Sequence, residues 1–116
     1  MKNWKHVKEL RNCTPHEVAV LVGDSMIRVA PSGNVVRLNT HCKPCGDVMG
    51  IPVVVCKEGE PRGLPEPEDG VVFIVSSVVA KMVKRNDVMS PDTSDAGAIR
   101  DGNGYIIGVK QLQLFH

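Results

Sequence analysis

The sequence predicts an α+β domain that is mostly β, with a compact antiparallel or mixed sheet that could close into a barrel, and one short helix. Its 116 residues fit a single domain, 1–116. Its 19 valines outnumber six leucines and six isoleucines, and β-branched side chains favour strands. With only one Trp, one Tyr and two Phe, small aliphatic groups must fill a thin core. Such a core favours a homo-oligomer, for which residues 1–11 are the candidate contact.

The first half of the chain predicts three short strands. Residues 18–22 and 26–29 have extended apolar patterns on either side of a Gly-Asp turn, which is typical of a hairpin. Residues 30–33 supply Pro and Gly at turn positions. This second turn leads to a third strand at 34–38.

The middle of the chain predicts one buried strand between two loops. Polar residues, a proline and two glycines favour a loop over 39–50. The unbroken apolar run at 51–56 is typical of a strand buried on both faces. The prolines and glycines of 57–70 then indicate a rigid loop.

A strand followed by a helix is predicted next. Residues 71–75 form a second apolar run, and apolar residues recur at helical spacing from 78 to 85. Ser76 and Ser77 lie at the junction, where a serine is a favoured N-cap. We expect the helix to begin there.

The C-terminal part predicts a loop, a hairpin and a closing strand. Residues 87–98 contain Pro and Gly and favour a loop. Residues 100–104 are a strong turn signal between two apolar segments, which indicates a hairpin. The alternation over 109–115 predicts a last strand that completes the sheet.

The charge balance excludes some classes of function. Fourteen Lys and Arg against 13 Asp and Glu give a formal net charge of +1, whereas proteins that bind nucleic-acid polymers carry a basic excess. No apolar stretch reaches the ~18–20 residues of a membrane helix, and residues 1–11 lack the apolar core of a signal peptide. We therefore expect a cytoplasmic protein that acts on neither membranes nor nucleic-acid polymers.

The opening Asn-x-Thr-Pro-His at 12–16, followed by a valine-rich strand, resembles a widespread family of small bacterial and phage-encoded proteins. The resemblance spans most of the chain, with 40–47 outside it. Its further pieces are Pro-Ser-Gly at 31–33, Gly-Ile-Pro-Val at 50–53, Gly-Leu-Pro at 63–65, Ile-Val-Ser at 74–76, Arg-x-Asp at 85–87 before Pro91 and Asp92, and 101–108. It implies an architecture and a phage or prophage setting, hence the host cytoplasm, and it implies no reaction.

A second resemblance is one of kind and not of motif. Small oligomeric phage sponge proteins sequester the nucleotide signals of bacterial immune systems, as the anti-Thoeris and anti-CBASS sponges do, without cleaving them. The chain is similar to them in its small size and in the soluble, oligomeric state that we expect of it. None of their binding residues aligns with this chain, so this likeness implies only an anti-defence role in which a nucleotide-like signal is bound.

Three residues near the start of the first predicted strand are candidate ligand contacts. Asn12 and Thr14 can bind a ligand or can hold a local turn through hydrogen bonds to the backbone. His16 can donate and accept hydrogen bonds near neutral pH, which suits a phosphate, ribose or base edge. Both interpretations stay open.

The predicted strand-to-helix junction and the end of that helix supply the other candidates. Backbone N–H groups and hydroxyls at Ser76 and Ser77 can hold an anion or can simply cap the helix. Arg85 can pair with a phosphate while Asp87 accepts from a hydroxyl, or the two can form a salt bridge with each other. Arg28, Arg37 and Arg62 are further cations that the fold could bring together.

The four cysteines are Cys13, Cys42, Cys45 and Cys56. Cys42 directly follows His41 and is separated from Cys45 by two residues. This spacing suits zinc, but a second spaced pair is missing. We expect no cofactor, with zinc at Cys42 and Cys45 as the minor alternative. Disulfides are not expected in a reducing cytoplasm.

These observations favour a non-catalytic protein that binds a small anionic, nucleotide-like ligand. No nucleophile elbow, metal-carboxylate pair or His-rich metal motif is present, so no catalytic residue is assigned. One alternative is a structural or protein-interaction module without a small ligand. A second is a hydrolase of a signalling nucleotide.

Overall fold

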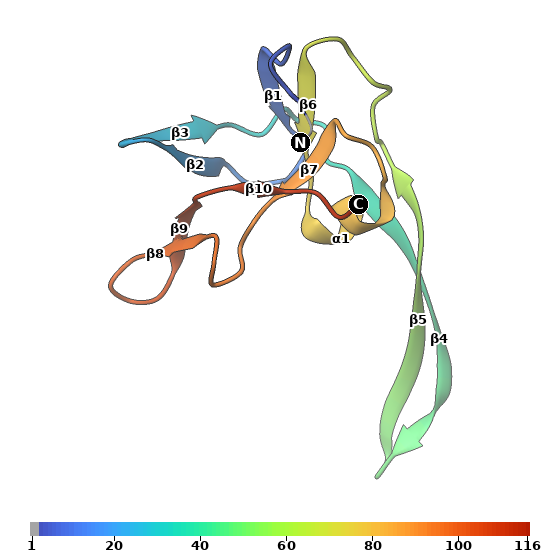
Figure 1. The fold of residues 1–116 in the computed structure, drawn as a ribbon. Helices are drawn as coiled ribbons and strands as arrows, with labels where there is room; N and C mark the ends of the chain where they lie inside the picture. The colour runs from blue at the N-terminus through green and yellow to red at the C-terminus, as the bar shows by residue number, and fades with distance from the viewer. Residues whose placement is uncertain (1–2) are drawn as a thin grey trace.

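The computed structural model describes residues 3–116 and confirms a mostly-β α+β fold with one short helix (Figure 1). The strands form two four-stranded sheets and a separate two-stranded hairpin. None of the sheets in residues 3–116 closes into a barrel. The barrel that the sequence allowed as one possibility is therefore absent from these residues, and the sheet edges stay open.

The first sheet has the strand order β1 (Glu9–Asn12), β6 (Val71–Ile74), β7 (Val88–Pro91) and β10 (Leu112–Gln113). The first three strands run parallel, and β10 pairs antiparallel with β7. Parallel neighbours need a crossover, which α1 (Ser77–Met82) provides between β6 and β7. The predicted helix is confirmed, although it ends earlier than its apolar pattern suggested.

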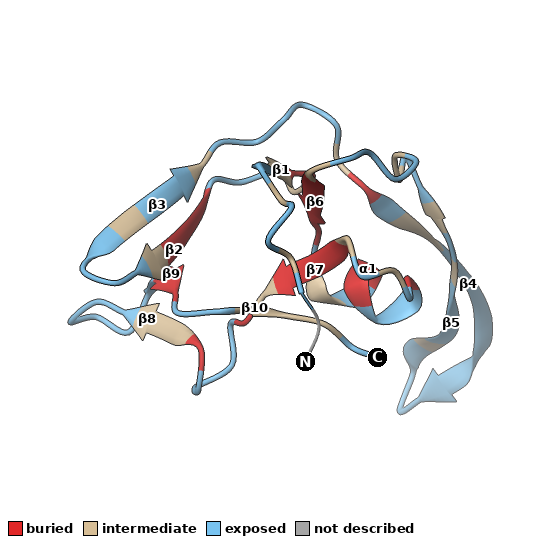
Figure 2. Cartoon of the chain, turned by 45° about the horizontal axis from the view of Figure 1, so that its top comes forward, coloured by how far each residue is buried: buried red, intermediate tan, exposed pale blue. Residues whose placement is uncertain are grey.

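Strand β6 lies between β1 and β7 in the first sheet and is buried on both faces, as the sequence predicted (Figure 2). Val71 and Phe73 pack into one hydrophobic cluster with α1 and the start of β7. Val72 and Ile74 point to a second cluster, which β2 and β9 also contribute to. One strand thus joins two small cores, because alternate side chains leave opposite faces of a sheet.

The second sheet has the order β3 (Ser25–Val29), β2 (Val18–Val22), β9 (Ile106–Val109) and β8 (Ala98–Arg100). It contains both predicted hairpins, since β2 pairs antiparallel with β3 and β8 with β9. A parallel contact between β2 and β9 joins them.

The largest error of the sequence prediction lies between residues 37 and 62. Residues 39–48 and 57–62, all expected as loop, belong to β4 (Arg37–Val48) and β5 (Ile51–Arg62), two 12-residue strands that pair with each other along their length. The rest of the second predicted loop, residues 63–70, lies outside the strands as expected. The run at 51–56 is a strand as expected, but it is mostly exposed instead of buried. Prolines are tolerated here because a two-stranded ribbon leaves half of its backbone N–H groups without a ladder partner.

Three other predictions need correction. Residues 88–91, expected as a loop, form the buried strand β7 between β6 and β10. The strand predicted at 34–38 begins only at Arg37. The strand predicted at 109–115 is reduced to the end of β9 and the two residues of β10, and β10 forms an edge and closes nothing.

We call residues 37–62 the arm and the remaining described residues the body. Figures 1 and 2 show the arm extending away from both sheets. The radius of gyration is 16.8 Å, whereas a compact domain of about 100 residues has one of about 13 Å. The difference is consistent with a compact body that carries a projecting ribbon.

Candidate functional site

Asn12 ends β1, and its buried side chain holds the turn that follows. Its Nδ2 donates to the backbone carbonyls of His16 (2.7 Å) and Val29 (2.9 Å). Its Oδ1 accepts from the Thr14 backbone N–H (2.9 Å) and from the Thr14 hydroxyl (2.6 Å). An amide offers two donors and two lone pairs, so Asn12 is fully used within the chain. Of the three opening candidates, His16 presents an exposed side chain to solvent.

The serine pair caps α1 at Ser76. The Ser76 hydroxyl accepts from the Val79 backbone N–H at 3.5 Å, and its backbone carbonyl accepts from Ala80 N–H at 2.9 Å. Ser77 is the first residue of the helix. The predicted N-cap is confirmed, and capping accounts for Ser76 without a ligand.

Arg85 and Asp87 form a two-point ion pair. Arg85 Nε donates to Oδ1 at 2.9 Å, and Nη2 donates to Oδ2 at 2.7 Å. The hydrogen bonds from Arg85 lower the pKa of Asp87 below its ordinary 3.8, and those to Asp87 raise the pKa of Arg85. Arg85 Nη1 also donates to the Pro65 carbonyl at 3.0 Å, and the guanidinium lies 5.9 Å from the centre of the Phe73 ring.

A second arginine holds the other end of the proline-rich segment 63–70. Arg11 donates to Glu68 at 2.7 Å and to Glu9 at 2.7 Å, and its guanidinium lies 5.6 Å from the centre of the Phe73 ring. These hydrogen bonds raise the pKa of Arg11, and the one from Arg11 lowers the pKa of Glu68. Segment 63–70 is therefore held against the rest of the body by the Pro65 carbonyl and the Glu68 carboxylate.

Five hollows at the surface of residues 3–116 show whether the seven candidate ligand contacts share a cavity. Asp87 lines one of them, together with Trp4 and His6. The other six candidates line none of the five. These hollows thus bring no two of the candidates together. The six candidates that line none of these hollows are Asn12, Thr14, His16, Ser76, Ser77 and Arg85.

The cysteines differ from the sequence prediction. Cys42 and Cys56 face each other across the arm and form a disulfide, which was not expected. Cys45 is an exposed free thiol, and Cys13 is a buried one whose pKa burial raises. Within residues 3–116 no three His, Cys, Asp or Glu side chains are grouped so as to hold a metal ion. While the disulfide is intact, Cys42 has no thiolate to offer zinc.

Two of the three additional arginines do come together. Arg37 and Arg62 are register partners at the base of the arm and line a hollow of about 380 Å³ with Asn39. Arg62 donates to Asn39 Oδ1 at 3.3 Å. Among residues 3–116 neither arginine has an acidic partner within 4.0 Å, whereas Arg28 is paired with Glu17.

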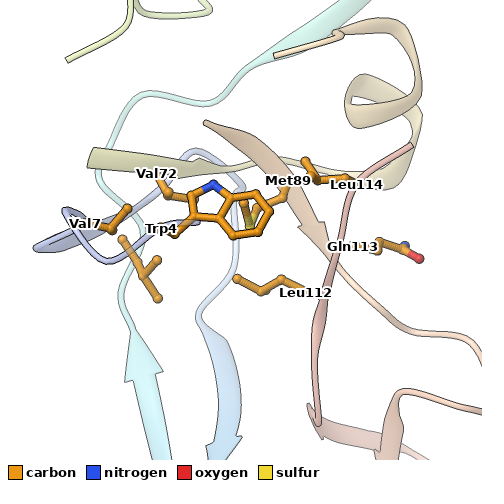
Figure 3. Close-up of a pocket in the computed structure, with 8 residues that line it drawn as sticks. Trp4, Val7, Val72, Met89, Leu112, Gln113 and Leu114 are labelled. Atoms are coloured by element: carbon orange, nitrogen blue, oxygen red, sulfur yellow. The ribbon is translucent and has the colours of Figure 1, made fainter. Parts of the chain in front are cut away.

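The sequence prediction did not find an open apolar hollow of about 460 Å³ over the second cluster, which we call the apolar hollow (Figure 3). Trp4 forms one wall, and its indole N–H donates to the Asn86 carbonyl at 2.8 Å. The apolar spacing of residues 4, 7 and 10 and of residues 112 and 114 was the available signal. The lining residues are Trp4, Val7, Leu10, Val72, Met89, Leu112, Gln113 and Leu114.

The tip of the arm, residues 47–51, is an exposed apolar surface. Met49 is 95% exposed, Ile51 64% and Val48 58%. Met49 has φ 53° and Gly50 has φ 82°, which matches a type I′ turn with positive φ at both central residues. Such turns favour Asn, Asp and Gly, so Met49 is an uncommon residue at a position with positive φ.

No family model, curated protein or solved structure matches this chain. Its function must therefore be inferred from its own residues. Among residues 3–116 no helix has the length and apolar character needed to cross a membrane.

Proposed function

We propose that the chain is a non-catalytic protein-interaction module that contacts a protein partner through its arm. The observation that carries this proposal is the arm itself, a two-stranded ribbon that keeps apolar side chains exposed along its outer half. The Cys42–Cys56 disulfide holds this ribbon closed, whereas an isolated hairpin without such a link is marginally stable in water. Contiguous exposed apolar surface is typical of interaction sites. A partner that covers the arm would bury this surface.

The hydrogen-bonding side chains of the body support the same proposal. Asn12 and Ser76 hydrogen-bond within their own segments, and Arg85 pairs with Asp87. A ligand that used these groups would have to break bonds that hold turns and loops. A partner that binds the arm would not have to break such bonds, since most side chains of the arm are already exposed.

Removing the arm tests the proposal. In the shortened variant Leu38 is joined to Pro61, its register partner, through an Asn-Gly turn, which keeps the base that packs on the body. We expect the thermal unfolding midpoint of the body to stay close to that of the full chain. We expect the shortened variant to lose any complex that the full chain forms, whether with itself in sedimentation or with another protein in producing cells. An arm-less protein that still associates like the full chain would refute the proposal.

A second candidate is the binding of a small anionic, nucleotide-like ligand, and the arginines at the base of the arm favour it. Arg37 and Arg62 line one hollow without an acidic partner within 4.0 Å among the described residues. Two guanidiniums suit phosphate oxygens. A sponge role, as the resemblance of kind implies, would place its signal molecule here.

Calorimetry against adenine nucleotides and cyclic nucleotide signals tests this candidate. We expect Arg37→Ala with Arg62→Ala to abolish any binding, and His16→Ala with Arg85→Ala to preserve it if the base of the arm is the site. If His16→Ala with Arg85→Ala abolishes binding while Arg37→Ala with Arg62→Ala preserves it, the ligand is bound by the candidates first predicted from the sequence. Recovery of an intact nucleotide from the denatured complex would exclude the hydrolase alternative.

A further inference from the structure

Two apolar surfaces of this chain are open to solvent, and they lie on different parts of it. The tip is at the far end of the arm, which Figures 1 and 2 show extending away from the sheet that carries the apolar hollow. Resting on the interaction function proposed above, we propose that the partner is a second copy of this chain. In this contact the tip of one copy inserts into the apolar hollow of the other.

The size and chemistry of the two surfaces fit each other. The hollow measures about 460 Å³, within the ~300–1,000 Å³ of pockets that enclose small organic molecules, so it can receive a few aliphatic side chains. Met49 has a long, unbranched side chain that adapts to irregular cavities, and its sulfur makes favourable contacts with aromatic rings. Trp4 supplies such a ring on the wall of the hollow.

The backbone at the tip points to the same residue. Met49 is held at φ 53° with its side chain almost fully exposed, a conformation that is unfavourable for a non-glycine residue and is not repaid by any burial within the chain. Insertion into the hollow would bury Met49 and offset that cost. The turn would then serve to present the side chain.

Charge also favours a second copy. Asp47 is the only charged residue in 44–56. Lys5 and Lys8 flank the hollow residues Trp4 and Val7 in sequence, are exposed, and have no acidic partner within 4.0 Å among the described residues. In the proposed contact Asp47, whose carboxylate also accepts from the Gly50 N–H at 3.1 Å, would lie near Lys5 and Lys8, which we call the basic rim. Such charge complementarity fixes the orientation of partners.

The arm is long enough for a stable interface. Specific interfaces of standard size use about 20–30 residues from each side, and the two strands of the arm have 12 residues each, most of them exposed. The tip alone would be a small contact, but the arm lying along a second body would reach the usual size. A small apolar molecule in the hollow would leave the arm uncovered.

Cross-linking between distinguishable copies tests the proposal. The full chain is made with benzoylphenylalanine in place of Met49, mixed with isotopically heavy protein, and illuminated. We expect light-heavy adducts on peptides that contain Trp4, Leu112 or Leu114. The matched control has the same probe at Val22, which is 53% exposed beside the turn of the β2–β3 hairpin, and it should give no adduct in the hollow.

Other adducts separate this inference from the function on which it rests. Adducts only with a different protein, when the probe is used in producing cells, would refute self-association while keeping the arm as an interaction site. Light-heavy adducts outside the hollow would refute the docking site. A chain that forms no adduct in either setting and sediments as a monomer would refute both proposals.

Sedimentation of variants gives a second, independent readout. We expect Met49→Asp to weaken association at least 10-fold, because it places a charge in an apolar hollow, and Val22→Asp to leave it unchanged. Both positions are exposed, so both proteins should fold, which circular dichroism verifies. Equal association of Met49→Asp and the wild-type chain would overturn the proposal.

A charge exchange tests the orientation. We expect Asp47→Lys to weaken association severalfold through repulsion from the basic rim. Adding Lys5→Glu and Lys8→Glu should restore it. If Asp47→Lys associates as tightly as the wild-type chain, or if the added changes fail to restore association, the proposed position of the tip against the rim is wrong.

Discussion

The body and the arm use the same kind of residue in opposite ways. In the body, the four residues of β6 are at most 6% exposed and pack into two cores. In the arm, Val54 and Val55 belong to an equally apolar run, yet they are 53% and 48% exposed. A run of valines therefore predicts a strand, whereas its burial depends on whether other elements cover both faces of that strand.

The largest expected effect tests whether the body carries the stability of the fold. Phe73 is fully buried beneath the guanidiniums of Arg11 and Arg85. Phe73→Ala should lower the free energy of unfolding by about 3–5 kcal/mol, because it removes apolar contacts and leaves a cavity. Urea unfolding followed by Trp4 fluorescence measures this loss. A loss below about 1 kcal/mol would mean that the core is less tightly packed than its burial indicates.

The next effect should be confined to the arm. Cys42→Ser with Cys56→Ser opens a loop whose ends are 14 residues apart, and closure of a loop of that size stabilises by about 3 kcal/mol in the chain-entropy model. We expect faster amide hydrogen exchange in residues 37–62 and unchanged exchange in β6 and β7. Equal loss of protection in both regions would contradict the separation of arm and body.

A smaller effect concerns how pH acts on the body. Asp92 is buried and accepts from the Ser94 N–H and hydroxyl and from Gln111 Nε2, which lowers its pKa below 3.8. A lowered pKa in the folded state stabilises above pH 3.8, and that stabilisation is lost as the pH falls through the lowered value. Asp92→Asn should flatten the acid side of the unfolding profile. If the profile is unchanged, the loss of stability at acid pH comes from other groups, such as Asp87.

The smallest effect should be at the tip. Met49→Ser should change the free energy of unfolding of the monomer by no more than about 0.5 kcal/mol, because the side chain contributes little burial to its own chain. Thermal unfolding at a low protein concentration measures this quantity. If the free energy of unfolding of the monomer falls by several kcal/mol, Met49 stabilises its own chain, and the arm is not separate from the body in stability.

Local patterns were sufficient where an element's partner is its neighbour in sequence. The β2–β3 and β8–β9 hairpins and the Ser76 cap of α1 depend on turn and capping residues a few positions apart. The buried strand β6 was also predictable, since its apolar run is short and bounded by turn residues. These features are encoded within short windows.

The remaining features depend on contacts between distant segments. β1 pairs with β6, and Arg85 reaches the Pro65 carbonyl, which no local pattern reports. The internal partners of the predicted ligand contacts could not be read from the sequence for a related reason. Asn12 and Arg85 have the right chemistry for a ligand, and in the fold they hydrogen-bond within the chain. The arm was missed because its prolines suggested a loop, although a two-stranded ribbon tolerates them.

The pairing of β1 with β6 has a consequence for synthesis on the ribosome. Glu9 is in register with Val71, so the first strand cannot find its place until the whole ribbon of 37–62 has emerged. The ribbon needs only its own neighbours and can form first, because closing a short local hairpin is fast compared with long-range pairing. A nascent chain would thus expose the apolar tip of a finished arm before its body is complete.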